Sequence, residues 1–500
     1  MHEAFAGAGI AAASVPRRPS GGPPWYAVCR GIASILAALV CACSLASAQT
    51  AEATIESVRA RVASLLARVP QSDAVALLVV DADTGQVWFA HQVDTPLKPA
   101  SVQKLFTTAA ALERLGPGFA YETRLYLRGN DLWVIGAGDP AIGDERLARR
   151  YGKDVTAVFD EWAAALRSRG VTSVGDLVLD DTIFDQRWTH PDWPDSQAEA
   201  WYQAPVGGLN VNDNCLDVRL IVRAGRVEVT SQPALPPEAL RSAARVAKQH
   251  RPILRRRPAG DGFELSGTVS RSATLRPLAV RQPTIFFGQA LRQALEQRGI
   301  RVTGSVVRRE LAALVGPEVP LARCTTSLVD VLWRANTHSQ NLFAECLIKS
   351  LVAYERDGRR SGVVGNWDGG RAVMLETLRT LGVDMTGATI RDGSGLSHQN
   401  RVTARQVVTL LTVMRRHRHG DVFVSSLAAA GEPGSMQHRF ADPALRGRLR
   451  GKTGSLDGVR SLAGYLHRPD GCVLAFALLA NTDGAADLPV DICRALVETN

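Results

Sequence analysis

The sequence predicts an α/β fold, in the broad α+β sense, with a central antiparallel sheet that is flanked by helices and interrupted by a long insertion. Both ends of the chain supply strand-like segments followed by a helix, at Ala74–Leu115 and at Val459–Val497. Between them, from about Tyr121 to Val307, short strands predominate. Two short polar motifs suited to one reaction begin at Ser101 and Ser339, 238 residues apart on either side of this insertion.

The first 48 residues are expected to be a signal peptide. Arg30 precedes an apolar run from Ile32 to Leu45, which is too short to span a bilayer, and Ala46-Ser47-Ala48 offers small residues to a signal peptidase. We expect cleavage after Ala48, export to the periplasm, and no transmembrane segment in the mature chain. The alternative is a lipid-anchored form, because Val40-Cys41-Ala42-Cys43 loosely resembles a lipobox.

The first part of the mature chain is expected to begin with an amphipathic helix at Thr54–Val69. Ala74–Val80 and Val87–Ala90 form a predicted hairpin across a polar turn. An Ala-rich helix then runs from Pro99 to Leu115, because it has good helix formers and no internal Gly or Pro after its first residue.

The insertion is expected to be mainly β. Its predicted elements are strands at Tyr121–Leu127 and Leu132–Ile135, a helix at Asp144–Arg169, a strand at Val171–Leu179, a Trp- and Pro-rich loop at Trp188–Pro205, strands from Cys215 to Val307, and a helix at Thr284–Arg298.

The C-terminal part returns to longer helices and ends in a hairpin. Its predicted elements are a helix from Leu328 that contains Ser339-Gln340-Asn341, a helix at Arg371–Leu381, a glycine-rich turn at Asp392–Ser397, a helix at Thr403–Arg415, strands at Val459–Leu466 and Val473–Leu479, and a helix at Leu488–Val497.

Ser101 and Lys104 are the candidate nucleophile and base. On a helix, residues three apart share a face, so the Lys104 amine can reach the Ser101 hydroxyl. A serine hydroxyl needs a base to take its proton, and a lysine acts as a base only when burial or a nearby cation lowers its pKa. Six of the 58 basic residues are lysines, and arginine cannot give up its proton, so a retained lysine indicates a need for an amine.

The remaining candidates complete the requirements of acyl transfer. Ser339 can pass a proton onward, and Asn341 can hold a substrate amide or the Lys104 amine. Lys452, in Lys452-Thr453-Gly454-Ser455, keeps positive charge in the site, lowers the pKa of Lys104 and attracts a carboxylate. The Thr453 and Ser455 hydroxyls suit that carboxylate, and the backbone N–H groups of Ser101 and Ser455 are the predicted oxyanion hole.

These motifs, in this order and spacing, resemble those of the penicillin-binding proteins and serine β-lactamases. The long gap between the first two is similar to the low-molecular-weight class C penicillin-binding proteins, the D-alanyl-D-alanine carboxypeptidase/endopeptidase family. Other matching segments are Pro99–Lys104, Gly138-Asp139-Pro140, Asn341-Leu342 with Ala344-Glu345, Asp392–Ser397, and Lys452–Leu456 with Gly458-Val459.

The resemblance implies a transpeptidase-like domain with two inserted domains. On this basis the catalytic domain comprises residues 49–121 and 322–500, inserted domain II residues 122–150 and 225–321, and inserted domain III residues 151–224. It also implies acylation of Ser101 by peptidoglycan stem peptides ending in D-Ala-D-Ala, release of D-alanine, hydrolysis, and covalent inhibition by β-lactam antibiotics. It implies neither a metal nor a cofactor. A β-lactamase and a catalytically silent peptidoglycan-binding protein are the alternatives.

Charge and cysteine content limit the partners. The net charge is +9, yet the basic runs are scattered and lack interleaved aromatic residues, so nucleic acid is not expected. An anionic wall or membrane surface is the expected partner, and a merely solvated arginine-rich surface is the alternative. The five mature cysteines (215, 324, 346, 472 and 493) contain no Cys-x-x-Cys, which argues against a zinc site and leaves room for one disulfide.

Overall fold

A computed structural model of the chain describes residues 52–70, 74–310 and 319–498. The predicted signal peptide and its cleavage site lie outside these residues. The chain divides into a short unit, which includes residues 52–57, and a large unit over residues 58–499. The helix expected at Thr54–Val69 is present over residues 52–66. The description below concerns the large unit.

The two ends of the chain form one antiparallel sheet, as the sequence predicts. Its strand order is β18-β19-β20-β21-β1-β2. The N-terminal strand β1 pairs with the C-terminal strand β21, with Val79 opposite Phe476. The strands are β1 (Val75–Asp81), β2 (Val87–His91), β18 (Ala428–Ala429), β19 (Leu449–Leu456), β20 (Val459–His467) and β21 (Val473–Ala480).

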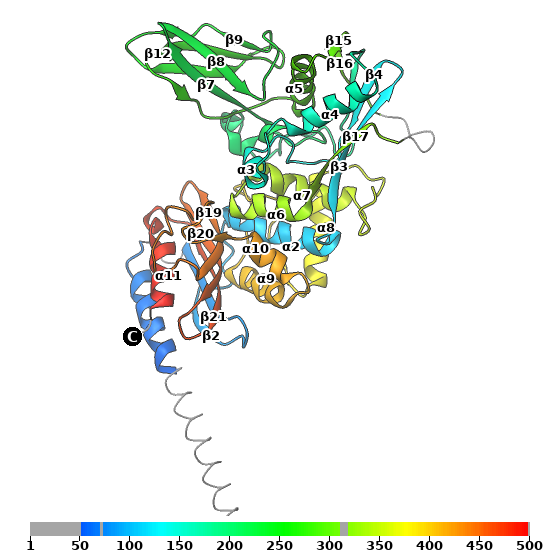
Figure 1. Ribbon diagram of the computed structural model, residues 1–500. Coiled ribbons are helices and arrows are strands. Elements are labelled where there is room, and N and C mark those ends of the chain that lie inside the picture. Colours follow the sequence, from blue (N-terminus) through cyan, green and yellow to red (C-terminus); the bar gives the residue numbers. More distant parts are fainter. Residues whose placement is uncertain (1–51, 71–73, 311–318, 499–500) are drawn as a thin grey trace, which may run out of the picture. The chain divides into compact units, whose positions relative to one another are not determined.

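A helical layer covers one face of this sheet, and α11 (Leu488–Val497) lies on the other (Figure 1). The central helix α2 (Lys104–Leu115) has ten of its twelve residues buried, which requires the small, apolar side chains that the Ala-rich sequence provides. The helices around it are α6 (Leu328–Thr337), α7 (Asn341–Ala353), α8 (Trp367–Thr380), α9 (Ala404–Arg416) and α10 (Gly420–Ser426).

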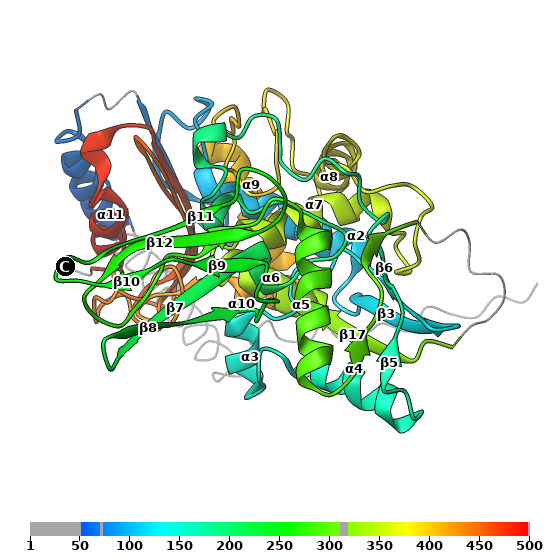
Figure 2. The ribbon, with the colours of Figure 1, turned by 90° about the horizontal axis from the view of Figure 1, so that it is seen from above.

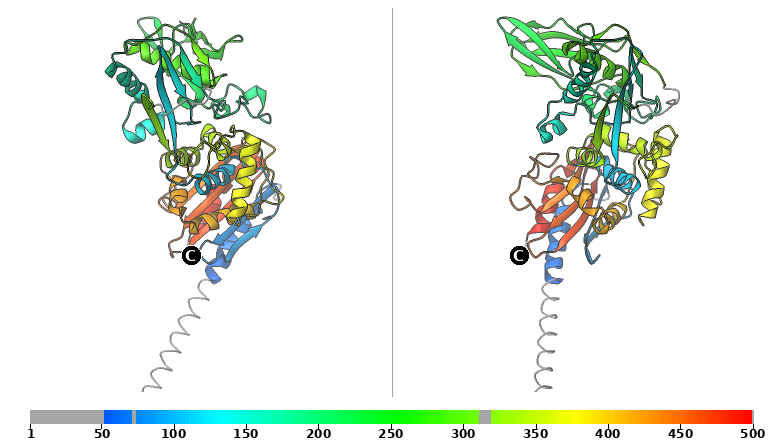
Figure 3. Two further views of the ribbon diagram at one scale, coloured as in Figure 1. Left: turned by 90° about the vertical axis from the view of Figure 1, so that its right-hand side faces the viewer. Right: turned by 45° about the vertical axis from the view of Figure 1, so that its right-hand side comes forward.

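The insertion leaves and rejoins this domain through two neighbouring strands. Strand β3 (Ala120–Arg128) pairs with β17 (Ala322–Ser327), and Figures 1 and 3 show them side by side between the helical layer and the inserted part. They belong to a five-stranded sheet of order β16-β6-β4-β3-β17. Its other strands are β4 (Asp131–Ile135), β6 (Leu177–Asp180) and β16 (Val306–Arg308).

The inserted part also contains two four-stranded sheets, a two-stranded sheet of β5 (Ser173–Val174) and β15 (Arg301–Val302), and the helix α5 (Pro283–Gln297) (Figure 2). One four-stranded sheet contains β7 (Cys215–Arg223), β8 (Arg226–Gln232), β13 (Ala273–Thr274) and β14 (Leu278–Ala279). The other contains β9 (Leu240–Ser242), β10 (Arg245–Val246), β11 (Arg251–Arg256) and β12 (Phe263–Val269). The inserted part has a hydrophobic core separate from that around α2. The boundaries between two inserted domains remain a prediction.

Several predicted elements differ from the structure. The expected helix Asp144–Arg169 is two helices, α3 (Glu145–Tyr151) and α4 (Ala157–Ser168), because Gly152 adopts a left-handed φ of +61° and ends the first. The expected strand Val171–Leu179 is two strands, β5 (Ser173–Val174) and β6. The five described cysteines are free thiols, so no disulfide joins them. None of the described helices is long and apolar enough to cross a bilayer.

Candidate active site

Ser101 lies on a short 3₁₀ turn, Ala100–Gln103, that leads directly into α2. The helix expected from Pro99 therefore begins as a tighter turn. Ala100 has a left-handed φ of +47°, which a non-glycine residue adopts only when its surroundings hold it there. Two glycines lie against this turn: a Cβ on Gly395 would be 1.9 Å from the Ala100 carbonyl oxygen, and one on Gly454 would be 2.7 Å from the Pro99 carbonyl oxygen. The nucleophile is thus held by packing on both sides.

The Lys104 amine lies at the centre of the site and is fully buried. Its Nζ is 2.9 Å from Ser101 Oγ, 2.6 Å from Asn341 Oδ1 and 2.9 Å from the Ser394 carbonyl oxygen. The Asn341 and Ser394 oxygens can only accept hydrogen bonds, whereas a serine hydroxyl can also donate. An ammonium group would donate to all three oxygens, whereas a neutral amine donates its two N–H bonds to the Asn341 and Ser394 oxygens and can turn its lone pair toward the Ser101 hydroxyl.

Burial lowers the pKa of Lys104 to about 7, while the nearby Glu345 and Asp392 carboxylates oppose this shift. The sequence predicted that burial or the charge of Lys452 would lower this pKa, and in the structure burial is the main cause. Burial and the charge of Lys104 also lower the pKa of Lys452. At neutral pH Lys104 is consequently available as a base, which a solvated lysine is not.

Ser339 and Asn341 lie at a turn between two helices, not within one helix as expected. Helix α6 ends at Thr337, and α7 begins at Asn341. Ser339 adopts a left-handed φ of +58°, and its Oγ accepts a hydrogen bond from Lys452 Nζ at 2.8 Å. The break in the helix allows Ser339 and Asn341 to contact different lysines.

Strand β19 contains Lys452, Thr453, Gly454 and Ser455. This segment was not predicted to be a strand. Lys452 is fully buried and also donates a hydrogen bond to the Thr453 carbonyl oxygen at 2.8 Å. Because Gly454 has no side chain, β19 approaches the turn that carries Ser101; a Cβ there would be 3.2 Å from the Ser101 backbone nitrogen. This close approach brings the backbone around Ser455 toward the nucleophile.

The residues that support the Ser394 carbonyl are not among the site residues predicted from the sequence. Glu345, fully buried on α7, accepts hydrogen bonds from the backbone N–H groups of Gly393 (3.0 Å) and Ser394 (2.7 Å) and from Trp367 Nε1 (2.7 Å). Burial raises the pKa of this carboxyl to about 7, and the three donors oppose that shift. The Ala344-Glu345 match was the only signal for it in the sequence.

The insertion also contributes to the site, which sequence reasoning did not find. The Tyr202 carbonyl oxygen accepts a hydrogen bond from Asn341 Nδ2 at 2.7 Å. Trp193 Nε1 donates to Asp392 Oδ2 at 2.9 Å, and Asp192 accepts from Ser397 Oγ at 3.1 Å. The Trp- and Pro-rich loop therefore contacts both segments that hold the Lys104 amine, through backbone positions and side chains that no motif identifies.

A cavity of about 450 Å³ opens onto these groups. Its catalytic-domain lining includes Ser101, Ser339, Asn341, Thr453 and Ser455. The insertion adds Gln197, Trp201 and Tyr202. The volume is within the usual range for a small-molecule site, and its walls combine aromatic surface with hydroxyl and amide groups.

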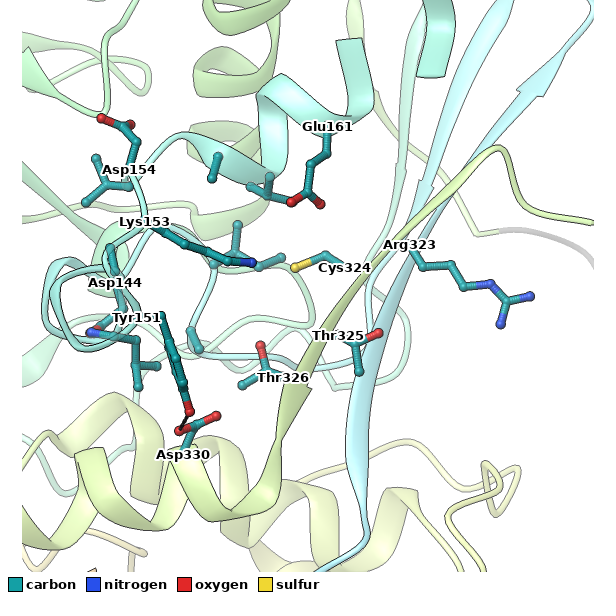
Figure 4. A pocket seen from close by; sticks show the side chains of 18 residues that line it. Asp144, Tyr151, Lys153, Asp154, Glu161, Arg323, Cys324, Thr325, Thr326 and Asp330 are labelled. Carbon is teal, nitrogen blue, oxygen red and sulfur yellow. Dashed lines mark hydrogen bonds between the residues drawn. The ribbon is translucent and has the colours of Figure 1, made fainter. Parts of the chain in front are cut away.

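A second cavity of about 200 Å³, between α3, α4 and β17, contains none of the predicted site residues (Figure 4). In this cavity the Tyr151 hydroxyl donates a hydrogen bond to Asp330 Oδ1 at 2.6 Å (Figure 4). Burial raises the pKa of the Cys324 thiol that lines it, so the thiol stays protonated. This cavity offers no activated nucleophile.

Comparison with known proteins identifies similar chains over most of the sequence. Residues 58–499 match the model of the D-Ala-D-Ala carboxypeptidase 3 (S13) family. A D-alanyl-D-alanine carboxypeptidase of Actinomadura sp. is 32% identical over 451 residues, covering 83% of this chain and 79% of that protein. The D-alanyl-D-alanine carboxypeptidase DacB of Haemophilus influenzae is 23% identical and covers 87% of this chain and 91% of that protein.

Solved structures show the same fold. The crystal structure of penicillin binding protein 4 (dacB) from Haemophilus influenzae has a TM-score of 0.70 and 22% identity, covering 87% of this chain and 98% of that one. A crystal structure of the same protein complexed with a novel β-lactam has a TM-score of 0.65 and covers 88% of this chain and 99% of that one.

Proposed function

The chain belongs to the D-Ala-D-Ala carboxypeptidase 3 (S13) family and is a serine-type D-Ala-D-Ala carboxypeptidase, and we propose that it acts through an acyl intermediate on Ser101. The substrates are peptidoglycan stem peptides that end in D-Ala-D-Ala. The Ser101 hydroxyl attacks the carbonyl carbon of the penultimate D-alanine, and Lys104 takes the hydroxyl proton. Cleavage of the peptide bond releases the terminal D-alanine, and water then hydrolyses the ester.

The positions of the other predicted residues support the roles that we propose for them. Ser339, hydrogen-bonded to Lys452, is placed to deliver a proton to the leaving amine. Thr453 and Ser455 line the cavity, where their hydroxyls can bind the substrate carboxylate. The backbone N–H groups of Ser101 and Ser455 are the proposed oxyanion donors, each contributing about 10²- to 10³-fold to the rate.

The observation that carries this proposal is the environment of the Lys104 amine. Asn341 Oδ1 and the Ser394 carbonyl oxygen can only accept hydrogen bonds, so they can accept both N–H bonds of a neutral amine. The lone pair of the amine can then face the Ser101 hydroxyl. A merely structural buried lysine would be paired with a carboxylate, as Lys349 is with Asp185 at 2.7 Å. The geometry therefore supports general base catalysis.

A fluorescent penicillin tests the proposal. The hydroxyl oxygen of Ser101 bonds to the β-lactam carbonyl carbon, the lactam C–N bond breaks, and the nitrogen takes the proton. We expect a lasting adduct on the wild type and none on Ser101→Ala. Rapid loss of the adduct would indicate a β-lactamase, and no label would indicate a catalytically silent protein. Assays on D-Ala-D-Ala peptides and on cross-linked dimers then measure the carboxypeptidase activity and the proposed endopeptidase activity.

We further propose that the exported enzyme acts in the periplasm and associates peripherally with the wall through its insertion. Residues 215–281 contain 13 Lys and Arg residues but only five Asp and Glu residues, so this segment has a net charge of +8. The net charge of the whole chain is +9. Arginine is frequent throughout the sequence, yet elsewhere acidic residues nearly balance it. This imbalance favours an anionic partner such as the carboxylate-rich wall polymer.

Four unpaired arginines lie on the outer face of the sheet formed by β9 to β12. In the strand register, Arg241 and Arg255 flank Glu264, while Arg245 and Arg251 flank Thr268. All four are exposed, and none has an ion-pair partner among the described residues. Guanidinium groups bind carboxylates through paired hydrogen bonds, which suits the stem peptides.

Co-sedimentation with purified peptidoglycan tests this association. We expect the variant R241Q/R245Q/R251Q/R255Q to bind several-fold more weakly than the wild type. The control R68Q/R169Q/R301Q/R446Q removes equal charge from exposed positions elsewhere and should bind as the wild type does. Equal binding by both variants, or binding only to anionic lipid vesicles, would contradict the proposal.

A further inference from the structure

The turn that presents Ser339 is strained, so other contacts must hold it. A left-handed φ costs a non-glycine residue on the order of 1 kcal/mol or more, and Ser339 has a φ of +58°. Its side chain contacts Lys452, which itself belongs to the site. The neighbouring residue, Gln340, is the central residue of the motif and has no role in the reaction proposed above.

Gln340 anchors this turn from behind the cavity. Its side chain is 5% exposed and spans two partners: Oε1 accepts from the Asn341 backbone N–H at 2.9 Å, and Nε2 donates to Asp213 Oδ2 at 2.5 Å. Its own backbone N–H donates to the Arg334 carbonyl oxygen at 3.3 Å. Gln340 thus links the backbone between Ser339 and Asn341 to a carboxylate of the insertion.

Asp213 is presented by a local structure that leaves it little freedom. Asn212, Asp213 and Asn214 all have left-handed φ values, +52°, +55° and +52°. The Asn214 amide fixes the turn through Pro205 and Asn210, with donor-acceptor distances of 2.7 and 2.6 Å. Three consecutive strained residues indicate that the position of the Asp213 carboxylate is specifically held.

A buried arginine completes the arrangement. Arg334, on α6, has a side chain that is 4% exposed, and it pairs with Asp213 at 3.0 Å. It also donates from Nε to Asp144 Oδ2 at 2.7 Å. Asp144 and Asp213 both belong to the insertion, so one guanidinium ties two of its segments to the helix that precedes the Ser339 turn.

We propose that Asp213 is a positioning residue of the active site, which holds the Ser339–Asn341 turn in its reactive conformation through Gln340. Asp213 does not line the 450 Å³ cavity and touches no reacting atom. The inserted segment therefore completes the active site as well as flanking it. This inference rests on the proposed function, because it concerns the rate of Ser101 acylation.

A double-mutant cycle on acylation by a fluorescent penicillin tests the inference. The variants are Asp213→Ala, Gln340→Met and the double variant, and Asp213→Gly, which tolerates the left-handed φ at this position, replaces Asp213→Ala if the latter does not fold. Because an ångström-scale displacement of a catalytic group costs up to about 10²-fold in rate, we expect each single variant to slow acylation by about 10- to 100-fold. The double variant should be no slower than either single one, with the apparent affinity for penicillin within about twofold of the wild type.

Asp217→Ala is the matched control. Asp217 is half-buried near the start of β7, four residues after Asp213, and accepts a hydrogen bond from Asn212 at 2.7 Å, but among the described residues it forms no hydrogen bond or ion pair with Gln340 or Arg334. It should lower the melting temperature and leave the acylation rate unchanged. Wild-type acylation by folded Asp213→Ala, or losses that multiply in the double variant, would overturn the inference. A wild-type protein that takes no label would instead refute the proposed function.

Discussion

The protonation state of Lys104 should control the rate at which Ser101 is acylated. Burial lowers the pKa of this amine to about 7, so the neutral, basic form increases as the pH rises through that value. Its fraction is about one-tenth at pH 6, one-half at pH 7 and nine-tenths at pH 8. The same amine in water, with a pKa near 10.4, would be neutral in only about 0.04% of molecules at pH 7. Burial thus raises the amount of base about a thousandfold.

The experiment varies the pH and compares the wild type with the variant Lys104→Arg. The acylation rate constant of the wild type should rise about tenfold between pH 6 and pH 8 and then level off. Arginine preserves the charge but cannot accept the proton, so Lys104→Arg should be at least about 10³-fold slower at every pH. Stopped-flow fluorescence with a labelled penicillin measures both. A flat profile from pH 5.5 to 8.5, or a variant with more than a tenth of the wild-type rate, would refute the role of Lys104.

Three further changes test the surroundings of this amine. Glu345→Gln removes a negative charge that raises the pKa of Lys104, so the midpoint of the pH profile should shift to lower pH in the same assay. Gly454→Val would place a side chain against the Pro99 carbonyl, where even a Cβ would be 2.7 Å away; we expect acylation to be lost, and a rate within tenfold of the wild type would contradict the packing. Arg334→Met would leave the Asp144 and Asp213 carboxylates without their buried partner, and calorimetry should show a loss of about 3–5 kcal/mol in the free energy of unfolding.

Features that depend on local spacing could be predicted from the sequence. The antiparallel sheet built from both chain ends is confirmed by the pairing of β1 with β21. The reach of Lys104 to Ser101 follows from a three-residue separation on a helical turn and is observed at 2.9 Å. The strands and the helical turn follow from short-range geometry, which a run of side chains specifies by itself. The pairing of the two chain ends was inferred instead from the strands and helix that each end supplies.

Tertiary structure alone decided how the amine becomes a base. Lys104 contacts the backbone carbonyl of Ser394, and Asn341 contacts that of Tyr202. Because every residue has a backbone carbonyl, these contacts cannot be predicted from residue type. The turn at Ser339 interrupts what periodicity predicted as one helix, because long-range contacts of Lys452 and Asp213 hold it there. The pKa of Lys104 depends on burial, and burial arises only when segments hundreds of residues apart in the chain pack around one nitrogen.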